Sequence, residues 1–359
     1  MRIVWATVLA VELERAGVQR LRVESESGGA PALNYTSLAG FCRVGDRVLL
    51  NTTAVDLGLG TGGSHIVVAR TSATSPATGV SYDAPSGGHV MKLRYTPLQR
   101  DVMAVESPES PHHALLEEAD DVGGMPVVCC GLHSQLPLVA AAVKQSRPDA
   151  RVAWCMTDEA ALPFALSELV PACASAGLVD VTVSCGQAFG GDLEAVTLHS
   201  GLVAARLVGH ADVAVVGIGP GVVGTGTALG HGGIAQGEAL NAVAAVGGRS
   251  VAALRVSFAD ARSRHRGVSH HTLVALSRIA LAPATVAVPR LPAEELAVVE
   301  SGLSEAGVWA RHIRADAGDG YALPDTRGVE CRSMGRTSAD DPAFFAAAAA
   351  AGSVAAGML

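Results

Sequence analysis

Aromatic side chains are scarce in this sequence, which has 359 residues, 4% of them aromatic and 49% hydrophobic. Ala, Val, Gly and Leu supply most of the apolar surface instead, a mixture that suits helices packed closely on a parallel sheet. The chain is longer than one ordinary hydrophobic core can organise, so its length predicts two domains.

Positive charge and paired cysteines are also lacking. A net charge of −8 argues against a general nucleic-acid binder or a membrane-surface binder. The seven cysteines include no CxxC pair, and Cys129 and Cys130 lie side by side in an apolar run. They indicate small core side chains in a reducing compartment rather than a disulfide framework.

No run of the sequence suggests a membrane span. Residues 3–11 are apolar, but they continue into Glu12 and Glu14 without a convincing cleavage site, which argues against a signal peptide. The alanine-rich stretch from Phe344 is too small-sided and too interrupted to cross a bilayer. We therefore expect a cytoplasmic protein with no nucleic-acid or membrane partner. The sequence is also consistent with a homo-oligomer.

Residues 1–100 have the pattern of a small N-terminal β-barrel domain. Short strand-like runs at 2–11, 19–23, 47–51 and 65–69 are separated by glycine corners, and 91–95 is expected as a last strand. Residues 71–88 are rich in Ser, Thr, Gly and Pro and predict a mobile loop. Residues 101–124 contain prolines and acids and are expected to be a linker with one helix after Pro111.

Residues 125–316 alternate between strand-like and helical stretches, which predicts a doubly wound, mostly parallel α/β sheet of the Rossmann-like class. The expected strands are 127–130, 151–156, 179–184, 212–218, 250–257, 284–289 and 308–314. The expected helices are 135–145, 162–176, 193–208, 234–246, 271–282 and 293–306. Residues 317–359 form a tail that either packs on this domain or is partly disordered.

The stretch at 212–233 joins an apolar, β-branched run to a loop with seven glycines. Gly219, Gly221 and Gly224 spell GxGxxG, and Thr225 follows. Such a loop either holds an anion or phosphate on its backbone N–H groups or serves only as a tight turn between strand and helix. A dinucleotide site is opposed by Pro220 in the second position and by the same spelling at 58–63 between two strands.

Histidines, arginines and a cysteine gather directly after the predicted strands. In open α/β sheets ligands bind beyond the carboxyl ends of the strands, where the strand order switches direction. The residues that follow these ends include His133, Cys185, His231, Asp260, Arg262, Arg264, His265, Arg266, His270 and His271. A strand order of 3-2-1-4-5-6 would place the loop of His133 beside the glycine loop. We therefore expect a ligand site along this edge of the sheet.

These residue types indicate proton transfer and anion binding. Imidazole titrates near neutral pH, so His133, His265 and His271 are the candidates for acid–base catalysis. Guanidinium groups match the oxygens of phosphate or carboxylate, and the candidate anion ligands are Arg262, Arg264 and Arg266.

Other roles stay open for the same stretch. His231, His270 and Asp260 could join these histidines in a metal site, although the spacing matches no standard zinc pattern. Ser269 is expected to cap a helix that begins near His271. Cys185, at a strand end, is either an activated thiol or a small buried side chain. The sequence therefore does not define a cofactor: a metal ion, a nucleotide or no cofactor at all would each be consistent with it.

Several motifs together resemble a known family. They are LNTTAVDLGLGTGGSH, MKLRYTPLQ, GPGVVGTGT, RHRGVSHHT and SMGRTSADDPAFF. Over nearly its full length the chain resembles the bacterial family catalogued as domain of unknown function 3866. The resemblance implies a conserved bacterial cytoplasmic protein and assigns no activity or catalytic residue, so the predicted site depends on the placement of residues along the sheet edge.

Three functions are consistent with these observations. The first is an enzyme that acts on a phosphorylated or otherwise anionic small molecule by histidine acid–base chemistry. The second is a sensor that binds a nucleotide or metabolite without turnover. The third is an assembly module in which the glycines serve packing alone.

Overall fold

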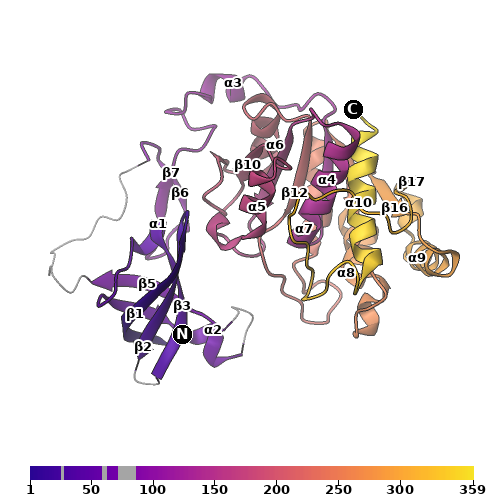
Figure 1. Ribbon diagram of the computed structural model, residues 1–359. Coiled ribbons are helices and arrows are strands. Elements are labelled where there is room, and N and C mark those ends of the chain that lie inside the picture. The colour runs from indigo at the N-terminus through magenta and orange to yellow at the C-terminus, as the bar shows by residue number, and fades with distance from the viewer. Residues whose placement is uncertain (26–27, 59–62, 72–85) are drawn as a thin grey trace. The chain divides into compact units, whose positions relative to one another are not determined.

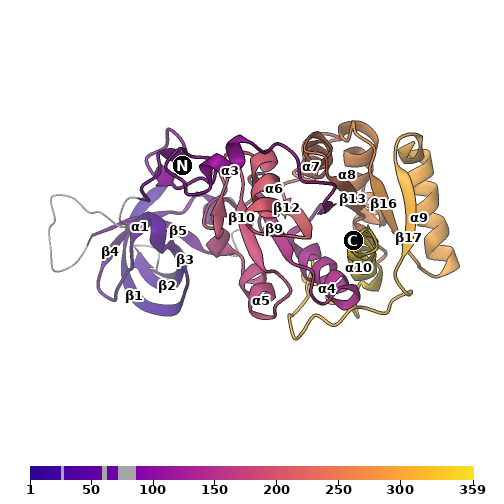
Figure 2. The same ribbon diagram turned by 90° about the horizontal axis from the view of Figure 1, so that it is seen from above.

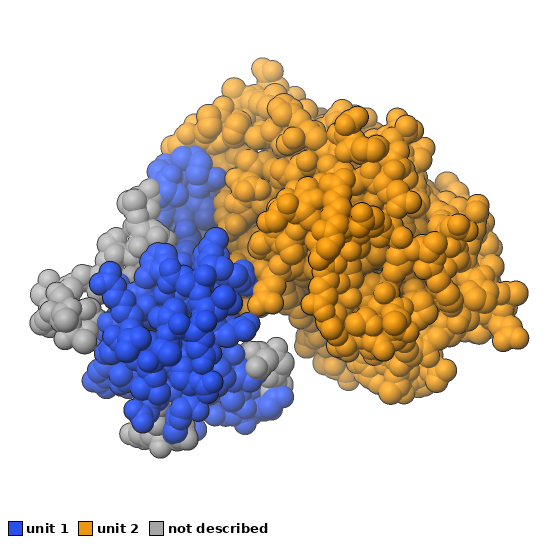
Figure 3. Space-filling view, in the orientation of Figure 1, with its two compact units in different colours: residues 1–103 blue, residues 104–359 orange. Residues whose placement is uncertain are grey.

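The computed structural model describes residues 1–25, 28–58, 63–71 and 86–359, and it divides into two compact units at residues 1–103 and 104–359 (Figure 3). Most of the loop predicted at 71–88, and the central part of the glycine pattern at 58–63, lie outside the described residues. Each unit has a hydrophobic core of its own.

The first unit is a closed barrel, as the sequence predicted. Its strands follow the order β1-β2-β3-β5-β4 around the barrel. Their bounds are β1 Ile3–Arg15, β2 Val18–Ser25, β3 Gly28–Tyr35, β4 Arg47–Asn51 and β5 His65–Thr71, and two short helices are α1 Thr36–Ala39 and α2 Thr53–Asp56. Alternate side chains fill the interior, among them Val8, Leu21, Val48, Leu50 and Val67. The strand β3 was not predicted.

The strand predicted at 91–95 does not belong to the barrel. Within the described residues, β6 (Val90–Lys92) pairs with β7 (Arg100–Val102) alone, in a separate two-stranded sheet. The strand stops at Lys92 because Leu93 and Tyr95 have φ angles of 51° and 59°. This left-handed conformation is incompatible with continued strand pairing.

The second unit is built on an eight-stranded sheet in which every neighbouring pair is parallel. The strand order is β11-β10-β9-β12-β8-β13-β16-β17. The bounds are β8 Pro126–Cys129, β9 Val152–Thr157, β10 Val181–Ser184, β11 Leu193–Glu194, β12 Val213–Ile218, β13 Arg249–Ala253, β16 Thr285–Pro289 and β17 Ile313–Ala317. The central strands are buried on both faces, which explains their continuous Val, Ala and Cys runs.

Helices cover both faces of this sheet (Figures 1 and 2). α4 (Leu136–Ser146), α5 (Leu169–Ser175) and α10 (Pro342–Ala356) lie on one face. The other face carries α6 Leu198–Leu207, α7 Ile234–Ala245, α8 His270–Val274 and α9 Ala293–Glu305, and α8 continues as a π-helical turn at Ala275–Ile279. A short helix, α3 (His113–Glu117), precedes the sheet. The arrangement confirms the predicted Rossmann-like α/β class.

The order of the expected strands differs from 3-2-1-4-5-6 by the exchange of strands 1 and 4, and β11 lies outside this numbering. In chain order the strands run 3-2-4-1-5-6-7 across the sheet, since β12 lies between β9 and β8. Apolar runs that are buried on both faces carry no signal for which neighbour they pair with. β8 and β12 are still adjacent, so the loop of His133 does lie beside the glycine loop: His133 Nδ1 is 3.1 Å from the carbonyl oxygen of Ile218.

Several element boundaries also differ from the prediction. The helix expected at 162–176 is a 3-10 turn at Phe164–Leu166 followed by α5. The helix expected at 193–208 begins only at Leu198, where Thr197 caps it. Leu193 and Glu194 form β11 instead, because they pair with β10. The strand expected at 308–314 begins at Ile313, after a 3-10 turn.

The alanine-rich tail forms α10, which is almost wholly buried against α4 and the sheet. Small side chains allow this close packing: a Cβ added at Gly352 would lie 2.2 Å from the carbonyl oxygen of Val139 in α4. Among the described residues, no helix has the length and apolar character that crossing a membrane requires.

Candidate functional site

Two loops at the carboxyl edge of the sheet carry most of the predicted site residues. One follows β12 and holds the glycines and His231. The other loop follows β13. It contains two short antiparallel strands, β14 (Val256–Ser257) and β15 (Gly267–Val268), which residues 258–266 connect. α8 starts immediately afterwards. The predicted cap is present, since Ser269 Oγ accepts a hydrogen bond from the backbone N–H of His271 at 3.3 Å.

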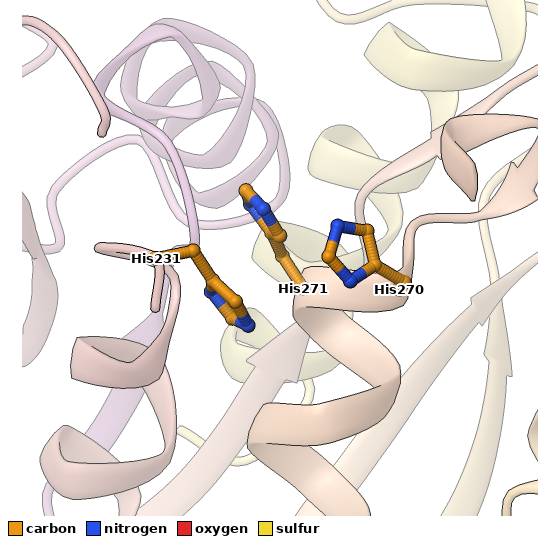
Figure 4. Close-up of side chains that lie close together, drawn as sticks. All are labelled: His231, His270 and His271. Atoms are coloured by element: carbon orange, nitrogen blue, oxygen red, sulfur yellow. The ribbon is translucent and has the colours of Figure 1, made fainter. Parts of the chain in front are cut away.

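Four imidazole rings come together where these loops meet. The rings of His231 and His271 stack at a centroid distance of 3.9 Å, and His270 lies 4.4 Å from His271. His265 lies 5.0 Å from His271 and 5.1 Å from His270. Figure 4 shows His271 between His231 and His270. We call His231, His265, His270 and His271 the histidine cluster.

Hydrogen bonds fix which ring nitrogen carries the proton in neutral His231 and neutral His271. His231 Nε2 lies 3.1 Å from the carbonyl oxygen of Ala228, which can only accept, so Nε2 carries the proton and Nδ1 the lone pair. Among the described residues, His231 Nδ1 and His270 Nε2 are buried without a hydrogen-bond partner. His271 Nδ1 lies 3.5 Å from Nη1 of Arg255, which can only donate. The Nδ1 atom of His271 therefore accepts, and the Nε2 atom of His271 carries the proton.

Arginines and one aspartate surround the cluster. Asp260 pairs with Arg262 at 2.8 Å, with Arg336 at 3.5 Å and with Arg255 at 3.8 Å. Only 3% of the Asp260 side chain is exposed. The cations around it hold its carboxyl pKa well below the usual range, chiefly through the hydrogen bonds from Arg262. One buried carboxylate therefore faces three guanidinium groups.

The C-terminal tail completes this network. Arg336 also donates to Asp341 at 3.0 Å, and Asp341 accepts a hydrogen bond of 2.7 Å from Ser257. Asp341 stands directly before α10, so the tail and its helix are tied to the loop after β13. Together Arg255, Arg262, Arg336 and the nearby Arg264 provide four positive charges against the two negative charges of Asp260 and Asp341.

Burial and this positive charge keep the cluster histidines neutral. Burial, as the largest cause, and the neighbouring His231, His270 and Arg255 together lower the pKa of His271 to about 3. Burial and Arg255 likewise lower the pKa of His265 to about 4. The pKa of His270 is lowered by burial, by His231 and by Arg264. At neutral pH these rings are therefore neutral donors and acceptors rather than cations.

The glycine loop folds over the cluster as a small hairpin. Gly224 pairs with His231, and Thr225 N donates to the carbonyl oxygen of Gly230 at 3.0 Å. A Cβ added at Gly224 would lie 3.4 Å from His271, and one at Gly233 would lie 2.8 Å from it. The GxGxxG stretch does not lead into a helix, since α7 begins only at Ile234. This geometry differs from a dinucleotide-binding turn, in which the glycines open directly into the helix.

His133 lies in a different place, in a pocket of about 560 Å³ next to the glycine loop. The pocket is also lined by Ser167 and Gly221. His133 Nδ1 donates to the carbonyl oxygen of Ile218, so Nε2 accepts the hydrogen bond of 2.8 Å from Ser167 Oγ. Burial lowers the pKa of His133 to about 4.

The structure therefore brings together only part of the predicted set. Asp260, Arg262 and Arg264 lie with the histidine cluster, and Gly224 covers it. Gly221 lines the pocket of His133, whereas Gly219 lies against the carbonyl oxygen of Ala161, where a Cβ would be at 2.3 Å.

Three other predicted residues have different surroundings. Thr225 is exposed, and its hydroxyl bonds to Thr227 and Gly230 within the hairpin. Arg266 is exposed and forms no ion pair with a described residue. Cys185 is buried in the core against Gly201 of α6. It has no exposed sulfur of the kind that a reactive thiol requires.

Sequence reasoning missed Arg255, Arg336 and Asp341. Arg255 did leave a signal, because it is a charge between two apolar residues, Leu254 and Val256, close to the end of a strand. Asp341 left another, because an acid followed by proline is a common helix start. The meeting of Arg336 with Asp260 joins distant parts of the chain and left no local pattern.

Comparison with known proteins gives a family and nothing further. No curated protein and no solved structure matches the chain. The family model described as protein of unknown function (DUF3866) matches residues 31–352, which include β4, β5 and most of β3 in the barrel, the whole parallel sheet and the histidine cluster. The chain therefore belongs to the DUF3866 family.

Proposed function

We propose that the histidine cluster and its arginines bind a small phosphorylated or carboxylated molecule at the carboxyl edge of the sheet. The observation that carries this proposal is the charge balance: four guanidinium groups face two carboxylates beside four neutral imidazoles. A bound anion would neutralise this excess, and guanidinium groups offer paired donors that match phosphate and carboxylate oxygens.

Arg264 is the cation best placed to receive such a ligand. It is exposed and forms no ion pair with a described residue, whereas Arg255, Arg262 and Arg336 all share Asp260. Its charge acts on both His270 and Arg255. The Nε2 proton of His271 supplies a neutral donor in the same region.

The lowered histidine pKa values favour catalysis over simple sensing. A bound anion adds negative charge beside the imidazoles and raises their pKa from the present 3 to 4 toward neutrality. An imidazole whose pKa approaches the working pH is an efficient general acid or base. We infer that His265 or His271 transfers a proton once the anion is bound.

A thermal-shift titration tests the proposed anion site. Inorganic pyrophosphate at about one hundred times its dissociation constant should stabilise the full chain by about 2.7 kcal/mol. Arg264→Ala should remove most of this stabilisation. Arg278→Ala, an exposed arginine on the π-helical turn, should keep it. The proposal is wrong if phosphate, pyrophosphate and citrate all leave the melting temperature unchanged, or if both variants respond like the parent.

A further inference from the structure

We propose that His231, His270 and His271 form a binding site for a divalent transition-metal ion. One ligand nitrogen from each residue lies within 4.8 Å of the others. The three side chains come from two elements, the end of the glycine loop and the first turn of α8, and they lie side by side with His271 in the middle (Figure 4). The site is defined by these residues alone and does not depend on anion binding.

Two ring nitrogens in this group are buried with nothing to bind. Only 4% of His231 is exposed, and within the described chain its Nδ1 has no hydrogen-bond partner. His270 Nε2 is likewise buried without a hydrogen-bond partner among the described residues. A buried polar atom without a partner destabilises the fold, and a metal ion is the partner that a lone pair on neutral imidazole accepts most readily.

The other nitrogen of His231 is already held as it is in metalloproteins. Its Nε2–H donates to the carbonyl oxygen of Ala228. A ligand histidine almost always donates its second ring N–H to a carbonyl or carboxylate, which fixes both the tautomer and the ring orientation. The backbone of the glycine hairpin supplies that second contact here.

The third ligand requires only a small rearrangement. His271 Nδ1 and Nη1 of Arg255 are 3.5 Å apart, at the outer limit of a hydrogen bond, so His271 can leave this contact at little cost. Nitrogen ligands of a tetrahedral zinc ion lie about 3.4 Å apart, so the present separations of up to 4.8 Å close with side-chain movements of about 1 Å. Turning His271 off the face of His231 supplies that movement.

The donor set determines the class of ion. Three neutral imidazoles without a carboxylate or thiolate in the set suit Zn²⁺, Co²⁺, Ni²⁺ or Cu²⁺, whereas Mg²⁺ and Ca²⁺ prefer oxygen ligands. Three protein ligands also leave one position of a tetrahedral ion open, as in catalytic rather than structural zinc sites. The excess of arginine around the cluster favours an anion in that open position.

Metal uptake by the full chain, purified without a polyhistidine tag, tests the site directly. The chelator-treated protein should take up about one Zn²⁺ per chain, and Co²⁺ should give the intense visible absorption of a low-coordinate site. His231→Ala and His270→Ala should each weaken binding by more than the roughly 10–100-fold that losing an outer contact costs. His199→Ala removes an exposed histidine of α6 and should bind like the parent.

Each outcome decides the proposal. Circular dichroism identifies any variant that fails to fold, and the cobalt spectrum of the parent protein then decides without that variant. No stoichiometric uptake by the parent, or uptake that survives both His231→Ala and His270→Ala, overturns the metal site. Because the titration contains no phosphate or carboxylate, a negative result leaves the anion proposal to its own experiment.

Discussion

Buried neutral histidines make the folded chain sensitive to acid. His133 and His265 have a pKa of about 4 and His271 of about 3 in the fold, against an ordinary value of 6.5. At a pH between the folded-state and unfolded-state pKa values, these histidines are protonated in the unfolded chain and neutral in the folded chain. The free energy of unfolding is therefore at its full value above about pH 6.5 and falls as the pH drops toward 4, by about 1.4 kcal/mol per pH unit for each such histidine.

Urea denaturation from about pH 7 to about pH 5 measures this slope. His133→Gln should flatten the slope by the contribution of one histidine. His199→Ala should leave it unchanged, because His199 is exposed. An identical slope for His133→Gln and the parent would mean that folding does not exclude a proton from His133.

At the scale of elements, two helical glycines should respond in opposite ways to the same substitution. Gly352→Ala places a Cβ 2.2 Å from the carbonyl oxygen of Val139, so α10 and α4 must separate. Overpacking of this kind costs about 1–3 kcal/mol. At Gly302 in α9 a Cβ meets nothing within 4 Å, so Gly302→Ala should stabilise the chain by about 0.5–1 kcal/mol. Equal effects in chemical denaturation would contradict the α4–α10 packing.

The elements also show how far sequence reasoning reaches. Apolar runs such as 127–130 and 212–218 could be predicted as buried strands because both of their faces are apolar, and the barrel because its short strands alternate with glycine turns. The place of β12 between β9 and β8 could not be predicted, since the sequence of a Val- and Ala-rich strand does not indicate which strand pairs with it. β11 was missed because its two residues are a strand only by pairing with β10.

The candidate site divides in the same way. Strand ends could be located in the sequence, so the histidines after β8, β12 and β13 were found along one edge of the sheet. Which of them touch could not be found: His133 joins Ser167, while the other four join one another. That separation depends on the loop paths. The ion pairs of Asp260 with Arg255 and Arg336 depend on packing between distant segments.

At the scale of the whole molecule, the site belongs to one unit. Every residue of the histidine cluster and its ion pairs lies within residues 104–359, and the two core clusters of that unit contain no barrel residue. The fragment 104–359 should therefore fold alone and bind pyrophosphate within about twofold of the full chain. Calorimetry on the fragment and its Arg264→Ala variant measures this. A fragment that folds but has lost binding would show that the barrel contributes to the site.

The most direct test of the anion site follows the imidazoles themselves. Ring ¹⁵N signals of the histidines, assigned with single variants, can be recorded at neutral pH while pyrophosphate is added to the full chain. The cluster signals should begin in the neutral form, and those of His270 and His271 should move together until the site is saturated, while those of exposed His199 and His210 stay in place. Cluster signals that do not move at saturating pyrophosphate would contradict the account.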